Sequence, residues 1–436
     1  MTETLYSYFL EHPAVCTDTR EIRPGSIFFA LRGDNFNGNR FAELALEKGC
    51  AYAVVDEKEF AVNDRCILVE DVLASLQQLA NHHRRQLNIP VIGITGSNGK
   101  TTSKELINAV LSKKYKVLAT KGNLNNHIGV PLTLLSITSG HEIAIIEMGA
   151  NHQGEIAMLS RIAEPDFGII TNIGKAHLEG FGGIEGVKKG KGELYDFIRE
   201  RKGKLFVHGD DAVLIDLAAG TEKVTYGTKK LYDIVGAVKE DKAEQFISFR
   251  WATRYTAGNM SSAPLIHTKL VGIYNYYNLL CAACVGNYFK VSDEDINAAL
   301  AEYVPSNNRS QLQKTQSNTL ILDYYNANPS SMSLAIENFA GLDQPNKMVI
   351  LGDMLELGAE SAKEHEAIVD LLREKNISDA LLVGPLFIEA GRKANARTFA
   401  TSDDAAKWLK EHHVKNSTIL IKGSRGIKLE KVVEVL

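Results

Sequence analysis

The segment Ile92–Thr102 constrains the fold of this chain more than any other. An apolar strand enters a loop containing Gly96 and Gly99, and the loop ends in a Lys-Thr pair before an amphipathic helix. Glycines let the backbone fold closely around a polyphosphate, so that amide N–H groups meet its oxygens at the positive end of the helix. The residues predicted to bind phosphate are Thr95, Gly96, Ser97, Asn98, Gly99, Lys100, Thr101 and Thr102.

Two side chains of this loop carry most of its predicted chemistry. Lys100 supplies a point charge, and the Thr101 hydroxyl is placed to bind a magnesium ion that bridges two phosphates. Ile94 stands where the standard nucleotide-loop pattern has its first glycine, so the strict pattern is not met. The alternative is a purely structural glycine turn. The strand-loop-helix context favours phosphate binding.

Composition limits the classes of protein that fit. The chain has 436 residues, 44% of them hydrophobic and 23% charged, which is typical of a folded protein of two to four domains. A net charge of −4 without a long basic run argues against nucleic acid as partner. No apolar stretch is long enough to span a membrane, and no positively charged leader precedes an apolar segment. We therefore expect a cytoplasmic protein.

The five cysteines are scattered, as in a reducing compartment. Cys281 and Cys284 have the spacing of a metal or redox pair, but they lie in an apolar helical run without a second pair. Packing inside a buried helix is the favoured interpretation.

The order of predicted strands and helices indicates an α/β fold of three domains. Residues 1–88 form a small α/β domain. Residues 89–305 form a central P-loop domain, whose strands are apolar on both faces as in a buried parallel sheet. Residues 306–436 repeat the alternation as a Rossmann-like domain. We expect ATP to bind between the last two domains, where strand ends and loops meet across a cleft.

Several charged residues follow central strands, where such sheets build their sites. Glu147 ends a strand and replaces the aspartate expected to bind magnesium, although a helix cap or surface carboxylate fits the local pattern too. His177 follows the next strand, where a lone loop histidine is more often an ordinary polar residue. Local pattern does not distinguish Lys188, Lys189 and Lys191 from solvated surface lysines.

Together these motifs resemble the ATP-dependent Mur ligases over nearly the whole chain, and within that family the members that add D-alanyl-D-alanine. The segments that carry the resemblance are Gly93–Thr102, Gly122–Pro131, Glu147–Glu155, Thr171–His177, Tyr274–Asn278, Asp323–Pro329, Gly352–Gly358 and Lys422–Gly426. The Asp-Asn-Pro-Arg sequence expected in the sibling that adds a diamino acid is absent.

The resemblance implies roles that local pattern leaves open. Lys100 would hold the terminal phosphates, and Thr101 and Glu147 would bind a first magnesium ion. His177 and Lys191 would bind a second ion and take part in catalysis, with Lys191 carbamylated by carbon dioxide into a carboxylate-like ligand. The residues that would complete the ATP site are Asn275 and Asn278 by the adenine, and Arg309 and Asp323 from the last domain.

The resemblance also implies where the other substrates bind. Thr19 and Arg20 lie in the stretch that would receive a uridine diphosphate sugar. The further residues expected at the substrates are Asn125, Asn126, Tyr325, Asn326 and Asn328. Asn37 and Asn39 depart from the family pattern, where we expect aspartate and histidine, which weakens contact assignments in that segment.

The implied reaction joins UDP-N-acetylmuramoyl-tripeptide to D-alanyl-D-alanine, driven by ATP through an acyl phosphate, in peptidoglycan precursor synthesis. Two magnesium ions are expected, with domain closure on ligand binding and a monomeric protein. One alternative is another Mur ligase or a folylpolyglutamate-type ligase. A more distant one is a nucleotide-dependent switch protein, in which Glu147, His177 and Lys191 would form a two-metal set without a task.

Overall fold

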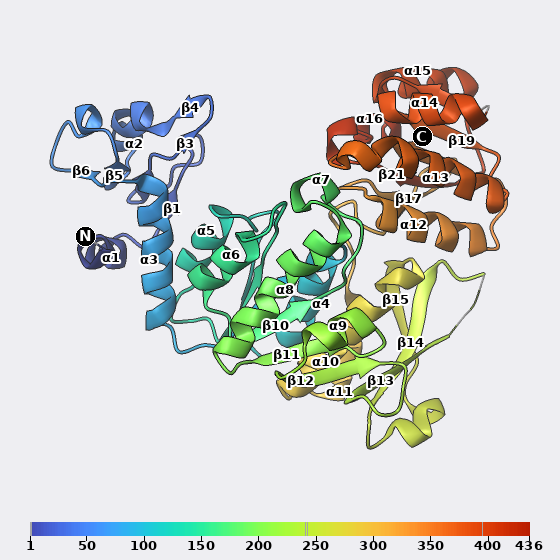
Figure 1. Ribbon diagram of the computed structural model, residues 1–436, viewed down its shortest axis with the longest axis horizontal. Coiled ribbons are helices and arrows are strands. Elements are labelled where there is room, and N and C mark those ends of the chain that lie inside the picture. Colours follow the sequence, from blue (N-terminus) through green and yellow to red (C-terminus); the bar gives the residue numbers. More distant parts are fainter. Residues whose placement is uncertain (1, 240, 242, 395) are drawn as a thin grey trace.

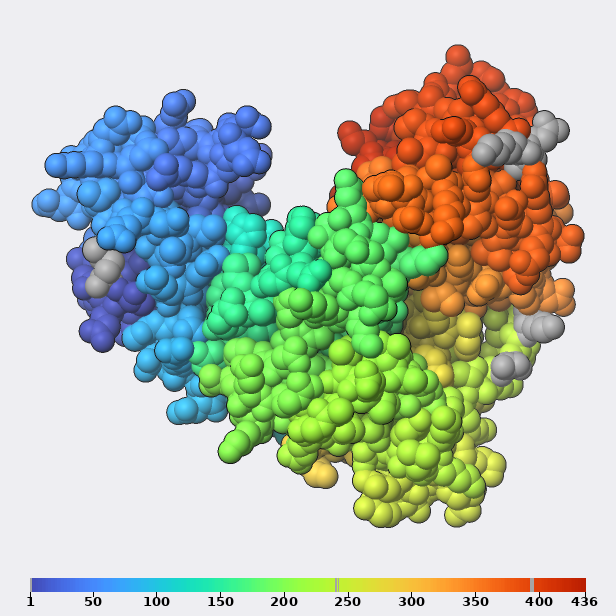
Figure 2. Space-filling model, in the orientation of Figure 1, coloured from blue at the N-terminus to red at the C-terminus, as the bar shows by residue number. Residues whose placement is uncertain are grey.

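The computed structural model describes residues 2–239, 241, 243–394 and 396–436. Three α/β units follow one another in an arc, with the N-terminal unit on one side, the central unit at the base and the C-terminal unit on the other side (Figure 1). The space-filling view shows an open hollow between the two outer units, above the central one (Figure 2). In the described part of the chain, no helix combines the length and apolar character needed to cross a membrane.

The N-terminal unit is a parallel four-stranded sheet in the order β1-β2-β5-β6. Strand β2 and most of β5 are fully buried, as their continuous apolar runs require. Its elements are α1 (Thr2–Glu11), β1 (Val15–Cys16), β2 (Ile27–Phe29), β3 (Arg32–Gly33), β4 (Phe36–Asn37), η1 (Gly38–Phe41), α2 (Ala42–Glu47), β5 (Tyr52–Val55), η2 (Lys58–Phe60), β6 (Cys66–Leu68) and α3 (Val72–Gln86).

The central unit is built on a nine-stranded sheet in the order β15-β14-β13-β12-β11-β10-β7-β9-β8. Its elements are β7 (Val91–Thr95), α4 (Lys100–Leu111), β8 (Val117–Ala119), α5 (Gly129–Leu135), β9 (Ile143–Glu147), α6 (Glu155–Ala163), β10 (Phe167–Ile170), α7 (Leu178–Phe181), α8 (Ile184–Glu200), β11 (Lys204–His208), α9 (Ala212–Leu217), β12 (Glu222–Gly227), β13 (Ile234–Lys239), β14 (Phe246–Thr253), η3 (Ala257–Ser262), β15 (Ile266–Val271), η4 (Ile273–Asn275), α10 (Tyr276–Tyr288) and α11 (Asp293–Glu302). Strands β8 to β13 pair in parallel, whereas β14 and β15 add an antiparallel extension that the sequence analysis did not predict.

The C-terminal unit is a six-stranded sheet in the order β16-β17-β21-β18-β19-β20, parallel except for β16. Its elements are β16 (Gln311–Lys314), β17 (Thr319–Asp323), α12 (Pro329–Gly341), β18 (Lys347–Gly352), η5 (Gly358–Glu360), α13 (Ser361–Glu374), β19 (Ala380–Val383), α14 (Pro385–Ala394), β20 (Arg397–Phe399), α15 (Ser402–His412), β21 (Thr418–Lys422), η6 (Arg425–Ile427) and α16 (Glu430–Val433). The predicted α/β class with three domains is confirmed. Each of the three large sheets lies within one predicted range, while the boundaries after residues 88 and 305 stay predictions.

The loops that carry the predicted site residues of the central unit lie at one edge of its sheet. Strands β7, β9 and β10 are neighbours, and each is buried almost throughout. Because parallel strands present their carboxyl ends at the same edge, the loops that follow these three strands converge there. Cys281 and Cys284 are free thiols fully buried in α10, as the packing interpretation predicted.

Candidate active site

The loop after β7 requires glycine at two positions. Gly96 has φ +141° and Gly99 has φ +78°, a region that side-chain-bearing residues rarely adopt. A Cβ on Gly96 would lie 2.0 Å from Thr171 Oγ1, and one on Gly99 would lie 2.8 Å from Asn278 Oδ1. Helix α4 begins directly after Gly99, so the loop leads into a helix N-terminus, as an anion site requires.

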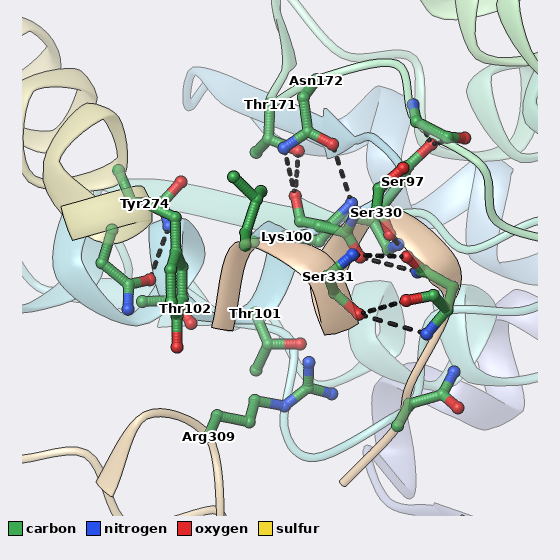
Figure 3. Close-up of a pocket in the computed structure, with 18 of the residues that line it drawn as sticks. Ser97, Lys100, Thr101, Thr102, Thr171, Asn172, Tyr274, Arg309, Ser330 and Ser331 are labelled. Atoms are coloured by element: carbon green, nitrogen blue, oxygen red, sulfur yellow. Dashed lines mark hydrogen bonds between the residues drawn. The ribbon is translucent and has the colours of Figure 1, made fainter. Parts of the chain in front are cut away.

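The segment after β10 holds this loop from behind. The Asn98 carbonyl accepts hydrogen bonds from Thr171 Oγ1 at 2.6 Å and from Asn172 Nδ2 at 2.9 Å. Ser97 Oγ and Gly174 exchange hydrogen bonds at 2.9 and 3.0 Å. Figure 3 shows Thr171 and Asn172 above the loop, joined to it by several of these bonds. The phosphate loop is therefore preorganised by its neighbour.

Lys100 lies at the mouth of the loop. Its Nζ donates to the carbonyl oxygens of Gly96 at 2.6 Å and Ser97 at 3.2 Å. Desolvation lowers the pKa of Lys100 to about 8, an effect that nearby Glu147 opposes and nearby Arg309 reinforces. An anion beside Lys100 would favour its charged form.

Thr101 and Glu147 meet beneath the loop. Thr101 Oγ1 lies 3.1 Å from Glu147 Oε1, which also accepts a hydrogen bond from Asn125 Nδ2 at 2.8 Å. Glu147 Oε2 is buried without a hydrogen-bond partner. The fully buried Lys104 places its Nζ 3.6 Å from that oxygen and donates to the Thr120 carbonyl at 2.5 Å. A hydroxyl beside an undersatisfied carboxylate is a donor set suited to a hard cation such as Mg²⁺.

His177 and Lys191 occupy different positions around the same region. His177 lines the cavity at the start of α7, with left-handed backbone (φ +52°). Lys191, on α8, is buried behind Ala150, to whose carbonyl its Nζ donates at 3.1 Å. Burial, together with the charge of Lys100, lowers the pKa of Lys191 well below its usual value. Lys191 therefore loses its proton more readily than an exposed lysine does.

Asn275 and Asn278 connect helix α4 to the C-terminal unit. Asn278 accepts a hydrogen bond from Ser103 on α4 at 3.0 Å and donates to Asn275 at 2.9 Å. Asn275 donates in turn to Ser310 Oγ at 2.8 Å. Both asparagines line the cavity, while these bonds also give them a structural function.

The C-terminal unit supplies charged residues, Arg309 and Asp323, to the opposite wall of the cavity. Arg309 stacks on the Tyr325 ring at 3.8 Å, its Nε is buried without a hydrogen-bond partner, and its side chain points toward Thr101 (Figure 3). Asp323 ends β17 and pairs with Lys422 of β21 at 2.6 Å. Asn328 Nδ2 donates to Asn98 Oδ1 at 2.7 Å, a direct contact with the phosphate loop.

One cavity of about 1270 Å³ unites most of the predicted site. The predicted residues that line it are Ser97, Asn98, Gly99, Lys100, Thr101, Thr102, Asn125, Asn126, Glu147, His177, Asn275, Asn278, Arg309, Asp323, Tyr325, Asn326 and Asn328. Thr95, Gly96 and Lys191 lie outside its lining; the Thr95 hydroxyl instead donates to the Met148 carbonyl at 2.8 Å. Asn126 Oδ1 accepts from the Gly129 N–H at 2.9 Å and so supports the start of α5.

Thr19 and Arg20 lie in the N-terminal unit, away from this cavity. The Arg20 side chain is 86% exposed and forms an ion pair with Asp18 at 2.5 Å. The Thr19 carbonyl accepts a hydrogen bond from Lys48 at 2.9 Å. The structure therefore presents this turn at the surface and does not join it to the phosphate loop.

Sequence reasoning gave no role to several residues of the site. Asn172 holds the phosphate loop in place, Lys104 holds Glu147 and Lys422 holds Asp323. Ser330 Oγ accepts a hydrogen bond from the Lys175 N–H at 2.9 Å, in the segment that follows β10. The available signal for Lys422 was its place at the end of a buried strand beside the strand that ends in Asp323. Across residues 2–239, 241, 243–394 and 396–436, no three His, Cys, Asp or Glu side chains gather into a metal cage. Metal ions in this cavity would therefore need ligands besides Glu147 and His177, such as Thr101, phosphate oxygens or a modified lysine.

The fold and the site define a class of ATP-binding ligase, and the chain belongs to the Mur ligase family. Residues 13–86 match the Mur ligase family catalytic domain, residues 94–286 the Mur ligase middle domain, and residues 308–425 the Mur ligase glutamate ligase domain. All three units of the structure therefore have counterparts in one family.

The similarity extends to particular members. The chain is 37% identical to the UDP-N-acetylmuramoyl-tripeptide--D-alanyl-D-alanine ligase of Bacillus subtilis, over 97% of this chain and 92% of the relative. A crystal structure of MurF from Acinetobacter baumannii is 30% identical, covers 97% of this chain and 92% of its own, and superposes with a TM-score of 0.85. MurF ligase from Thermotoga maritima, solved in complex with ADP, is 27% identical with a TM-score of 0.84, over 98% and 97% of the two chains.

Proposed function

We propose that this protein forms the amide bond between the tripeptide carboxylate of UDP-N-acetylmuramoyl-tripeptide and the amine of D-alanyl-D-alanine, using ATP and releasing ADP and phosphate. The observation that carries the proposal is the cavity that sets the phosphate loop and the Thr101–Glu147 pair against Arg309 and Asp323 of the C-terminal unit. The names of the similar ligases support this choice over other amide ligases of the same fold.

The residues of the cavity suit phosphoryl transfer to a carboxylate. The loop amides and Lys100 would hold the β- and γ-phosphates, and Arg309 would approach them from the opposite wall. Attack of the tripeptide carboxylate on the γ-phosphorus would give an acyl phosphate and ADP. The amine of D-alanyl-D-alanine would then attack the acyl carbon, pass through a tetrahedral intermediate and expel phosphate, its surplus proton leaving to solvent. Closure of the outer domains would exclude water from the acyl phosphate.

Magnesium fits the first part of this site. Thr101 Oγ1 and the undersatisfied Glu147 carboxylate would hold one ion, with phosphate oxygens completing its shell. When bound, magnesium neutralises charge that develops on the transferred phosphoryl group. Asn125 and Lys104 would keep Glu147 oriented toward it.

A second ion would need Lys191 in a modified form. A lysine ammonium repels cations, whereas the low pKa of Lys191 makes its neutral amine available to attack carbon dioxide. The N–C bond that forms gives a carbamate, and the amine loses one proton. We propose this carbamate and His177 as ligands of the second ion.

The remaining roles follow from position. We propose residues 1–88 as the domain for the uridine diphosphate sugar, with Thr19 and Arg20 at its pyrophosphate, residues 89–305 as the ATP domain and residues 306–436 as the domain for D-alanyl-D-alanine. Asn125, Asn126, Tyr325, Asn326 and Asn328 would contact the substrates, and Asn275 and Asn278 the adenine. We propose a cytoplasmic monomer.

The test is mass-spectrometric detection of product from purified protein, ATP, magnesium, bicarbonate, D-alanyl-D-alanine and UDP-muramoyl-tripeptides with either diaminopimelate or lysine as third residue. A pentapeptide mass that requires ATP and both substrates supports the proposal. ATP hydrolysis that neither substrate changes, with no product, would refute it and favour the nucleotide switch.

A further inference from the structure

The loop Gly352–Gly358 of the C-terminal unit brings a carboxylate to the central site. Glu356 Oε2 lies 2.5 Å from His177 Nδ1, a close charge contact that does not have the angle of a hydrogen bond, although the two residues belong to different units. The Glu356 carbonyl also accepts from the Glu179 N–H, at 3.5 Å, beside His177. Main chain and side chain of Glu356 therefore both meet the start of α7.

The loop is fixed by its own domain. The Met354 N–H donates to His365 Nε2 at 3.0 Å, and His365 is fully buried. The Leu355 N–H donates to Ser424 Oγ at 3.0 Å. These bonds anchor the two residues just before Glu356, so its position follows that of the whole C-terminal unit.

The backbone of Glu356 is in an uncommon conformation for a residue with a side chain. Its φ is +64°, a region that costs free energy outside glycine. Such conformations persist where the surroundings impose them, and they concentrate at functional sites. His177 has φ +52°, so both members of the contact have left-handed backbone.

We propose that Glu356 is a positioning residue that orients the His177 ring and so couples docking of the C-terminal domain to completion of the metal site. Once the imidazole turns to align its Nδ1–H with the Glu356 carboxylate, that contact favours the tautomer with the proton on Nδ1, which leaves Nε2 as the nitrogen free to bind a metal ion. This inference rests on the proposed role of His177. It makes the second ion bind well only after the domain has docked.

The structure offers a matched control in a second ion pair between the same two units. Lys175 Nζ lies 2.5 Å from Glu364 Oε1, and the Glu364 side chain is only 8% exposed. This pair joins the same two surfaces without touching His177. A change at Glu364 therefore tests docking alone, whereas a change at Glu356 tests docking together with ring orientation.

The experiment measures Mn²⁺ binding by electron paramagnetic resonance, in the full-length protein with bicarbonate and a non-hydrolysable ATP analogue. The variants are Glu356→Ala, Glu356→Gln, Glu364→Gln, His177→Ala and the double variant of Glu356→Ala with His177→Ala. We expect Glu356→Ala to weaken the second Mn²⁺ site about tenfold, Glu356→Gln to weaken it less, and Glu364→Gln to change it less than twofold. In the double variant, loss of Glu356 should have no additional effect.

The outcomes separate this inference from the proposed function. If the wild-type protein binds only one Mn²⁺, the proposed second metal site fails, and the inference fails with it. If His177→Ala loses the second ion while Glu356→Ala retains its full affinity, only the inference is overturned. If Glu356→Ala and Glu364→Gln weaken Mn²⁺ binding equally, Glu356 is only a docking contact. If Glu356→Ala binds the second Mn²⁺ more tightly, Glu356 competes with the ion for His177. Either result overturns the inference.

Discussion

The two predicted binding regions of this protein are built in opposite ways. In the central region, the phosphate loop, Glu147 and Arg309 face one cavity and are braced by buried neighbours. In the N-terminal region, Arg20 is exposed and contacts the carboxylate of Asp18 in its own turn. A preorganised centre suits charge stabilisation in a transition state, whereas an exposed turn suits capture of a substrate before closure. Changes in the centre should therefore affect kcat, and changes in the turn should affect KM.

The largest effect is expected at Lys100. Lys100→Ala should lower kcat by about a thousandfold, because it removes the cation that faces the developing phosphoryl charge. Lys113→Ala, just after the same helix, removes a surface lysine paired with Glu302 and should leave kcat within twofold. Initial rates of phosphate release with both substrates present measure this. A Lys100→Ala protein with normal kcat would remove the phosphate loop from the mechanism.

Lys191 should show the next largest effect. Lys191→Ala should lower kcat about a hundredfold and make it insensitive to bicarbonate. The wild-type protein, by contrast, should lose activity when carbon dioxide is removed. Lys189→Ala, which changes an exposed lysine two residues away, should remain bicarbonate-dependent. Intact-protein mass spectrometry can look for the carbamate directly. Equal bicarbonate responses in all three proteins would contradict carbamylation of Lys191.

Arg20 tests the other side of the comparison. Arg20→Ala should raise KM for the uridine diphosphate substrate about tenfold, the value of one charge-assisted hydrogen bond, with kcat nearly unchanged. Arg65→Ala changes another exposed arginine of the same unit and serves as the control. Steady-state kinetics at saturating ATP separate the two parameters. A fall in kcat without a change in KM would place Arg20 in the chemical step and end the distinction between the two regions.

The smallest predicted effect is on stability. Lys100 has a pKa of about 8 in the folded protein and an ordinary value near 10.5 when unfolded. Between these values the unfolded chain binds more protons, so the free energy of unfolding should rise with pH. Relative to the Lys100→Met variant, the free energy of unfolding of the wild-type protein should rise by at most about 1.4 kcal/mol per pH unit from pH 8 to 10. Denaturant unfolding at several pH values measures this, and a gain with the opposite sign would contradict the desolvation of Lys100.

Sequence alone predicted the central region better than the N-terminal one for a physical reason. Buried parallel strands and a glycine loop leave local signatures, so β7, β9 and β10 and the residues at their ends were found. Residues that act across units leave no such pattern. Glu356 and Lys422 belonged to recognised segments, yet their contacts with His177 and Asp323 required the fold.

Asn39 shows why the N-terminal region was harder to predict. The sequence showed only that Asn39 departs from the family pattern, which weakened the assignment of contacts in its segment. In the structure Asn39 is fully buried, accepts from the Asp56 N–H at 3.0 Å and donates to Asp56 Oδ1 at 2.7 Å. Short polar residues brace turns as readily as they bind ligands, and only burial distinguishes the two uses.

The most direct test of the account follows the oxygen of the tripeptide carboxylate. That carboxylate would be labelled with ¹⁸O, and the phosphate released during ligation analysed by mass spectrometry. An acyl phosphate intermediate predicts one ¹⁸O in each phosphate for each amide bond formed, because the attacking oxygen leaves with phosphorus. Unlabelled phosphate, with ligated product still forming, would contradict carboxylate attack on ATP and with it the proposed chemistry of this cavity.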